Sequence, residues 1–267
     1  MKSFKNLFLP ALLPFFMMIG CTDEDQTARL RITLVDDEGD YDEVNVDIQG
    51  VAVHKNENAG DHDNGWILLD GSNVGVKDLL EYTGGVELTL VDTDFPTGRL
   101  SQIRLLLGEK NTVTIGRASK PLETPSAEQS GLKLQVHEIL QGGITYNFKL
   151  DFDAALSVIH SADGKYILSP VINVYTEALS GSIKGSVIPA EENVAVILMN
   201  GVDEEASTYA PAGVSEFLFA DVAEGQYTIY FDPGEESLEY IRTPLENINV
   251  SLGEVTDVEE IKLDSKQ

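Results

Sequence analysis

The chain has 267 residues, enough for two modest domains, and its 42% hydrophobic content can supply a core for each. Its formal net charge of −27 comes from 45 acidic and 18 basic residues. A surface this acidic repels phosphate backbones, so we expect no nucleic-acid partner. A single cysteine excludes an intramolecular disulfide and a cysteine-built metal centre, and four histidines leave little for a histidine-rich one.

The first twenty residues have the pattern of a signal peptide. Lys2 and Lys5 supply a positive start, and an apolar run follows over residues 7–19. That run is too short for a membrane-spanning helix, which needs roughly 20 residues, but it suits the apolar region of a signal peptide. We therefore predict that residues 1–20 are removed.

The end of this segment reads Met18-Ile19-Gly20-Cys21 and resembles the lipobox of bacterial lipoproteins. The resemblance implies that Cys21 becomes the acylated N-terminus, carrying palmitate-type chains, and that residues 21–27 form an acidic tether. The alternative is an ordinary secretory signal that happens to end at a cysteine. Several buried acyl chains would make the attachment effectively permanent, because each methylene contributes about 0.8 kcal/mol.

The acidic residues 22–25 resemble the surface-export signal of lipoproteins in Bacteroides-type Gram-negative bacteria. The resemblance implies a lipid-anchored protein of the cell outer membrane, exposed at the cell surface. The periplasmic leaflet is the alternative location, since a solvated tether in an acidic chain has the same composition. In either case the membrane is reached through the lipid.

A β-rich domain is predicted over residues 28–178, because short apolar alternations recur there between turn residues. Leu30, Ile32 and Leu34 share one strand face. The phase of the second strand slips at Gly50, which predicts a bulge. Asp163-Gly164 predicts a hairpin between residues 158–160 and 166–168. One short helix is expected over residues 76–82.

A second all-β unit is predicted over residues 180–264. Turn glycines at nearly regular spacing separate six expected strands, which is typical of a small antiparallel sandwich. The expected strands cover residues 183–188, 194–199, 215–219, 227–232, 248–252 and 258–263. The fold class expected for the whole chain is therefore all-β, with two tandem β-sandwich domains and a minor short helix in the first.

The second unit also resembles a known family. Gly181–Val187, Val194–Leu198, Phe217–Val222 and Gly225-Gln226-Tyr227 are similar to the transthyretin-like modules called carboxypeptidase regulatory-like domains. The resemblance implies a non-catalytic spacer or support domain whose fold is shared with many sugar-binding modules.

The first unit contains a series of recognisable stretches: Asp40–Val46, Gly65-Trp66, Pro96–Gly98, Gln102–Leu105, Gln129–Leu134, Leu150–Ala154 and Leu168–Ile172. Together they resemble a large prokaryotic family of uncharacterised domains that are common in lipoproteins. The resemblance implies an extracytoplasmic β-sandwich and no particular activity.

No contiguous catalytic motif occurs, and no catalytic, cofactor-binding or metal-binding residue is predicted. Asp151 and Asp153 are expected on one face of a strand, where a solvated or local hydrogen-bonding role is favoured over acid–base catalysis. The stretch Asp61–Gly65 opens like a calcium loop but has Ser72 where a full EF-hand loop requires glutamate. Residues 36–40 and 92–94 are weaker calcium candidates. His54, His62, His137 and His160 are scattered.

Aromatic residues expected in loops offer one further clue: Trp66, Tyr41, Tyr82, Tyr209 and Tyr240 could stack on sugar rings or cap the end of a sandwich. We expect a non-enzymatic, membrane-anchored binding, adhesion or structural module, held off the membrane by two tandem sandwiches, with an extracellular glycan or protein as its ligand. The alternatives are a carbohydrate-binding component of a glycan-uptake system, tested through Trp66→Ala, and an enzyme with an unrecognised site.

Overall fold

A computed structural model of the protein describes residues 26–36, 41–58, 60, 64–124, 131–189, 193–235, 237 and 240–266. The predicted signal peptide, Cys21 and most of the acidic tether lie outside these residues. The described part is built almost entirely of β-strands, which confirms the predicted fold class. No helix within it is long and apolar enough to cross a bilayer.

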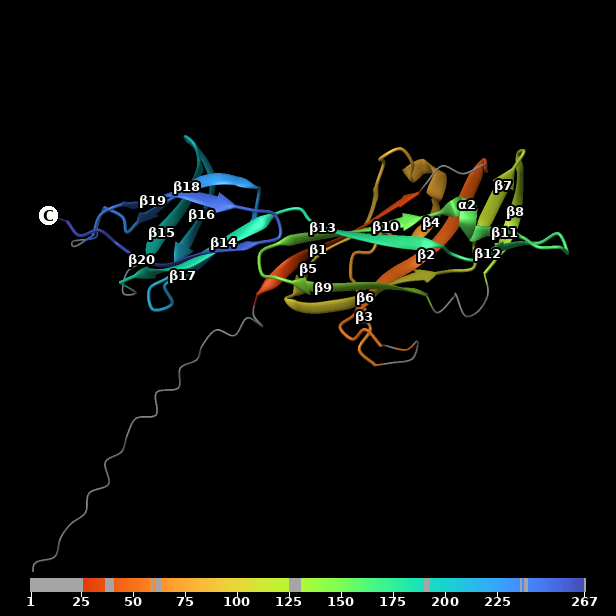
Figure 1. The fold of residues 1–267 in the computed structure, drawn as a ribbon, viewed down its shortest axis with the longest axis horizontal. Helices are drawn as coiled ribbons and strands as arrows, with labels where there is room; N and C mark the ends of the chain where they lie inside the picture. Colours follow the sequence, from red (N-terminus) through yellow and green to blue (C-terminus); the bar gives the residue numbers. More distant parts are fainter. Residues whose placement is uncertain are drawn as a thin grey trace, which may run out of the picture.

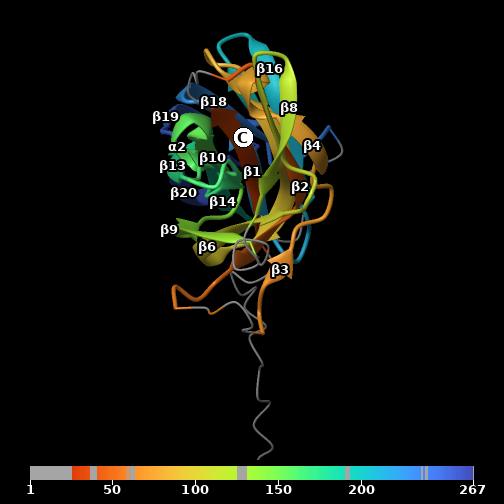
Figure 2. The same ribbon diagram turned by 90° about the vertical axis from the view of Figure 1, so that its right-hand side faces the viewer.

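The first sandwich packs a four-stranded sheet against a larger one (Figures 1 and 2). The smaller sheet has the order β13-β10-β1-β5, and its central strand β1 runs parallel to β10 and antiparallel to β5. These strands are β1 (Thr27–Asp36), β5 (Leu88–Pro96), β10 (Thr145–Phe152) and β13 (Ile172–Ala178).

The larger sheet of this sandwich has nine strands in the order β11-β12-β8-β7-β2-β6-β9, and β3 and β4 also pair with β2. Its strands are β2 (Glu43–His54), β3 (Ile67–Leu68), β4 (Gly75–Asp78), β6 (Gly98–Leu107), β7 (Thr112–Ile115), β8 (Ala118–Glu123), β9 (Leu132–Leu140), β11 (Val158–His160) and β12 (Tyr166–Leu168).

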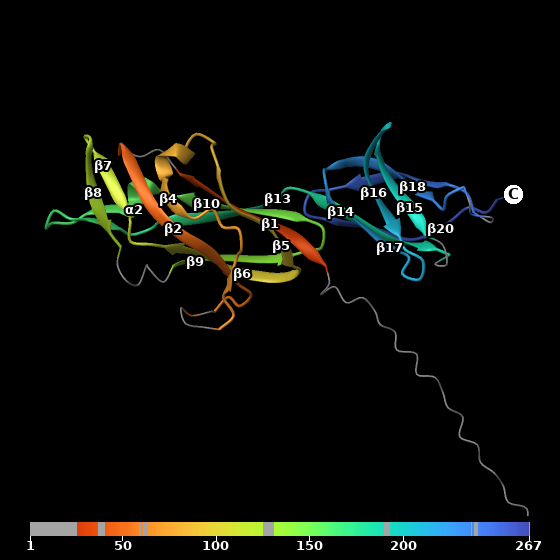
Figure 3. The same cartoon turned by 180° about the vertical axis from the view of Figure 1, so that it is seen from behind.

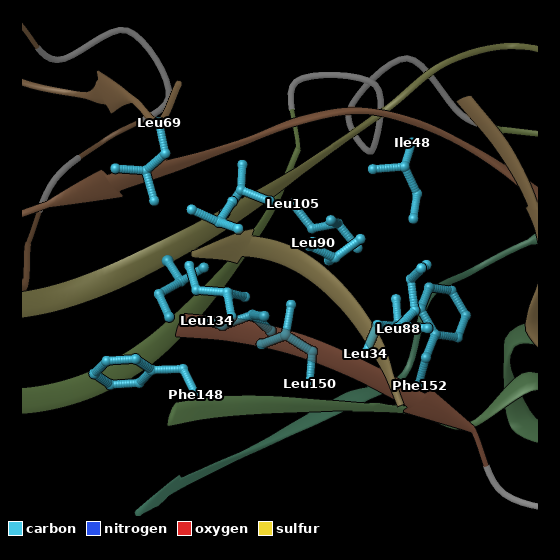
Figure 4. Packing of buried hydrophobic residues seen from close by; sticks show 14 of the residues in the cluster. Leu34, Ile48, Leu69, Leu88, Leu90, Leu105, Leu134, Phe148, Leu150 and Phe152 are labelled. Carbon is cyan, nitrogen blue, oxygen red and sulfur yellow. The ribbon is translucent and has the colours of Figure 1, made fainter. Parts of the chain in front are cut away.

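Period-two patterning explains why these strands form a core. Leu30, Ile32 and Leu34 are fully buried on the inner face of β1, as their alternation predicts. They meet side chains from β10, such as Phe148 and Phe152, and from the opposite sheet (Figure 4). This cluster is the hydrophobic core of the first sandwich.

The predicted turn features are confirmed in two places. The register of β2 against β6 shifts between Ile48 and Gly50, which is the expected bulge. β11 and β12 pair antiparallel around Gly164, whose φ of +85° favours glycine.

The helix predicted over residues 76–82 is only partly correct. Residues 75–78 form β4 and pair with β2, and a 3-10 helix, η2 (Leu79–Tyr82), follows. Asp78 separates the two elements because its carboxylate accepts a hydrogen bond from the Leu80 amide at 3.3 Å and caps η2. A short α-helix, α2 (Ala154–Ser157), was not predicted.

The second sandwich packs a three-stranded sheet, order β17-β14-β20, against a four-stranded sheet, order β16-β15-β18-β19. Its core is a separate cluster built around Val196, Leu198, Ile229 and Phe231. The strands are β14 (Gly181–Ile188), β15 (Val194–Asn200), β16 (Asp203–Ala210), β17 (Glu216–Val222), β18 (Gly225–Asp232), β19 (Thr243–Val250) and β20 (Val255–Lys262). Strand β16 was missed because its polar sequence lacks an apolar alternation.

The two sandwiches lie end to end, and β1 begins at the place where they meet (Figures 1 and 3). The segment between β13 and β14 is only two residues long, Leu179 and Ser180. Each sandwich therefore contributes side chains to a junction that lies close to the first described residue, Gln26.

Candidate functional site

The acidic residues considered for catalysis do not form a pair. Asp151 lies on β10, whereas Asp153 follows the end of that strand and caps α2 by accepting a hydrogen bond from the Leu156 amide at 2.8 Å. The expectation that both lie on one strand face was therefore wrong, because the chain turns into a helix at Asp153. Asp36 is buried and accepts a hydrogen bond from the Ala154 amide at 2.9 Å, so its role is also structural.

The carboxylates of Asp92 and Asp94 have arginine partners. Arg29 and Arg31 on β1 contact Asp92 at 2.6 and 3.1 Å, and Arg29 also contacts Asp94 at 3.5 Å. Burial alone would raise the pKa of Asp92, but the hydrogen bonds from the two arginines outweigh it and hold that pKa below its ordinary value. Two guanidinium groups here disfavour a calcium ion.

Residues 37–40 and 61–63 of the other calcium candidates lie outside the described residues. Within the described ranges, no group of three or more histidine, cysteine, aspartate or glutamate side chains could hold a metal ion.

The described histidines lie in separate surroundings. His54 is buried on β2, and its Nδ1 lies 2.8 Å from the Asn56 amide, which donates to it. His137 Nδ1 lies 3.7 Å from the Glu57 carboxylate. The ring of His160 stacks on Tyr166 with centroids 4.6 Å apart. His62 lies outside the described residues.

Trp66 is enclosed rather than presented to a ligand. The Arg104 guanidinium carbon lies 3.8 Å from its ring centroid, and the His54 ring lies 5.2 Å away. Both the Trp66 indole nitrogen and Arg104 donate to the Gly60 carbonyl, at 3.1 and 3.3 Å. This cluster fixes the loop after β2 onto the outer face of the large sheet. The indole of Trp66 is partly buried and is therefore poorly placed to stack on a sugar ring.

The same loop explains why part of β6 is buried on both faces. Ser101 and Gln102 donate to the carbonyls of Lys55 and Asn56, at 2.8 and 2.9 Å. The alternation of residues along β6 predicts that one face of this strand is exposed to solvent. No signal in the sequence indicates that the loop after β2 covers that face.

Among the other aromatic candidates, Tyr209 is distinctive. Tyr41, Tyr82 and Tyr240 are half-buried and pack against the two cores. Tyr209 lies on β16, with 66% of its surface exposed. Its ring is therefore accessible to a ligand.

A polar network joins the two sandwiches. The buried Thr145 amide donates to the Ser180 hydroxyl at 2.9 Å, and the Thr145 hydroxyl donates to the Asp221 carboxylate at 2.8 Å. The Asp221 amide donates to the Gly143 carbonyl at 2.7 Å, and the Ser182 hydroxyl to the Gly142 carbonyl at 3.1 Å. We call these contacts the junction network.

Two adjoining hollows lie beside this network. The smaller, of about 440 Å³, is lined by residues of both sandwiches, including Gln26, Leu140 and Val255. The larger, of about 810 Å³, lies over the second sandwich, and its size is within the range of ligand-binding pockets. Gln26, Lys184 and Asp257 line both hollows. We call the larger hollow the β16–β17 groove. It is lined by Gln26, Lys184, Gly185, Ser186, Thr208, Tyr209, Pro211, Val214, Glu216, Phe217, Leu218, Asp257, Glu259 and Glu260.

Comparisons with known proteins identify a family for the first sandwich. Residues 27–170 match the family described as Domain of unknown function (DUF4382). No curated protein matches the chain.

Among solved structures, the Bacillus anthracis TIE protein is similar over 90% of this chain, with 13% identity and a TM-score of 0.23. The chain spans about half of that protein, 51% of its length. The major pilin from Streptococcus pyogenes is similar over 89% of this chain and 97% of the pilin, with 10% identity and a TM-score of 0.16.

Proposed function

Since the chain belongs to the DUF4382 family, whose function is unknown, we propose a role from its own residues: a non-enzymatic, lipid-anchored binding module outside the cytoplasm. The signal-peptide pattern and the lipobox ending at Cys21 support export and acylation. The acidic residues 22–25 support a place on the cell surface, at the outer membrane.

The Met18–Cys21 sequence carries the proposed anchor, and the position of Gln26 bears on where that anchor would attach. Gln26 lines both hollows at the junction; it shares both linings with Lys184 of the second sandwich and the smaller one with Gly98 of the first. Gln26 is the fifth residue after Cys21, and a stretch of that length spans roughly 18 Å at full extension. An acylated Cys21 would therefore attach the protein at its middle.

This attachment changes the arrangement expected from the sequence. The sandwiches extend in opposite directions from the place where β1 begins (Figure 1). A lipid at Cys21 would hold both of them near the membrane, instead of using one as a spacer for the other. The junction network supports a fixed relation between them, because it pairs polar groups at a buried contact.

The second sandwich fits the proposed transthyretin-like assignment. Its sheets have three and four strands, and the stretches that carry the resemblance lie on β14, β15, β17 and β18. Tyr227 is buried in the row with Ile229 and Phe231 that its spacing predicts. We propose that this sandwich is non-catalytic, as the resemblance implies.

The anchor is tested by Cys21→Ser. The full chain is expressed in a Gram-negative host, and acylation is measured by mass spectrometry while membrane and soluble fractions are separated. The parent protein should carry acyl chains and sediment with membranes, and Cys21→Ser should be unacylated and released. Ser3→Ala, within the signal, is the control and should remain membrane-bound. An unacylated parent, or a Cys21→Ser protein that stays on membranes, would refute the anchor.

Attachment at the middle is tested by energy transfer. A single dye is placed on the anchored protein at Ser119→Cys on β8 or at Ser265→Cys near the C-terminus, both exposed positions at opposite ends of the molecule. Transfer to an acceptor in the bilayer should be similar from the two positions. Strong transfer from one position and none from the other would indicate a protein that stands on end.

A further inference from the structure

Strand β17 has an open hydrogen-bonding edge. It lies at the edge of its sheet and pairs with β14 alone in the described structure. The Val187 amide donates to the Ser215 carbonyl at 2.9 Å, which fixes the phase of the ladder. Because antiparallel partners alternate, Phe217 and Phe219 direct their backbone groups toward β14. The backbone N–H and C=O groups of Glu216 and Leu218 therefore point away from the sheet.

This open edge borders the β16–β17 groove. Glu216, Leu218 and Tyr209 all line it, and Tyr209 belongs to β16, an edge strand of the opposite sheet. At the far end of β17, the Asp221 amide is already bonded to Gly143 of the first sandwich. The unpaired stretch is therefore short and lies beside a hollow large enough for a few side chains.

The lining combines negative charge with apolar surface. Among the described lining residues, Glu216, Glu259 and Glu260 contribute carboxylates, and a fourth, Asp257, lies 3.6 Å from Lys184, the one lysine in that set. Tyr209, Pro211, Val214 and Leu218 add apolar area. Since the lining has more carboxylates than cations, a ligand with positive groups is favoured over an anionic one.

We propose that the β16–β17 groove binds an extended polypeptide segment with alternating basic and apolar side chains, which adds as a strand to the open edge of β17. Backbone hydrogen bonds to Glu216 and Leu218 supply affinity, and alternate side chains entering the groove supply specificity. The proposal gives the binding role of the protein a ligand class, and it does not depend on the lipid anchor.

A soluble chain that begins at Thr22 retains every described residue and is used for the test. The probe is an eight-residue peptide of alternating lysine and valine with blocked ends. Titration calorimetry measures its Kd, and amide hydrogen exchange reports where it pairs. We expect the Glu216 and Leu218 amides to exchange quickly in the free protein and to slow at least tenfold with peptide. Phe217 and Phe219, already bonded to β14, should change little.

Charge and backbone contributions are separated by matched probes. Glu216→Lys should weaken binding about fivefold or more, whereas Glu246→Lys, an equal charge change on an exposed part of β19 away from the groove, should leave Kd within twofold. A peptide N-methylated at alternate residues keeps its charge but cannot complete the ladder, and it should not bind measurably. This arm remains decisive even if Glu216→Lys folds poorly.

Several outcomes would overturn the proposal. Glu216 and Leu218 amides that exchange slowly without peptide would show that the edge is closed. Equal binding of the N-methylated peptide, or of a glutamate–valine peptide, would exclude strand addition or charge selection. Binding of a neutral glucose hexasaccharide in place of the peptide would assign the groove to glycans and leave the proposed binding role intact. A groove that binds none of these probes would refute the peptide proposal without affecting the acylation test.

Discussion

Replacing Ser180 with alanine tests whether the junction network stabilises the protein. Ser180 is 2% exposed and Thr145 is 3% exposed. The Ser180 hydroxyl accepts a hydrogen bond from the Thr145 backbone amide. Ser180→Ala removes one oxygen and leaves that amide buried without an acceptor. An orphaned buried donor costs about 1–3 kcal/mol, and the cavity left by a single oxygen is small. The melting temperature should fall by roughly 2–12 °C for a chain of this size.

The assay is calorimetric unfolding of the soluble chain. Ser207→Ala is the control: Ser207 is exposed on β16, so loss of its hydroxyl should change the free energy of unfolding by less than about 0.5 kcal/mol. Ser180→Ala should also separate the unfolding of the two sandwiches into two transitions, since the hydroxyl that it removes belongs to the junction network that joins them. A Ser180→Ala protein as stable as Ser207→Ala would show that the network contributes nothing.

Three further substitutions test other features. Asp92→Asn should lower the melting temperature at pH 7, because the folded pKa of Asp92 lies below its ordinary value and the ionised carboxylate therefore stabilises the fold. The difference in melting temperature between the parent and Asp92→Asn should be complete above about pH 4 and should disappear as the pH falls through the folded pKa. Gly65→Ala should cost roughly 1–3 kcal/mol in chemical denaturation, because φ is +118° and an added Cβ would lie 2.8 Å from Nε2 of His54. Phe148→Ala, in the fully buried core, should cost about 3–5 kcal/mol by the same measurement.

The glycine and phenylalanine substitutions each have a control variant, and Asp92→Asn is checked by its pH dependence. Gly71→Ala also has a positive φ, but no atom of a described residue lies within 4 Å of its Cβ, so it should cost less than Gly65→Ala. Tyr175→Ala removes an exposed ring from β13 and should change stability little. Equal costs within either pair, or a pH-independent effect of Asp92→Asn, would contradict the respective explanation.

Local patterning was sufficient to predict much of the fold. The inward row of β1, the bulge at Gly50 and the hairpin at Gly164 follow from short-range rules, because each depends on residues within one or two strands. β16 was missed for the same reason: its exposed, acidic sequence has no apolar face to reveal a strand.

The candidate site could not be predicted, because it depends on contacts between segments distant in sequence. Arg104 alternates with apolar neighbours and therefore reads as solvent-exposed, yet it covers Trp66 and contacts Gly60. Thr145 and Asp221 are ordinary polar residues until the fold brings them within 2.8 Å. The groove likewise combines residues of β14, β16, β17 and β20, and no single stretch of the sequence predicts that these strands lie together.

The position of β1 determines how the protein would resist mechanical force. β1 is flanked on one side by β10 and on the other by β5, and it starts at the junction. If the chain is held at Cys21 and pulled at the far end of the first sandwich, tension runs along β1 and its two ladders are loaded in shear. Many hydrogen bonds must then break together, instead of one after another as in peeling. The first sandwich should therefore resist unfolding when force is applied along β1.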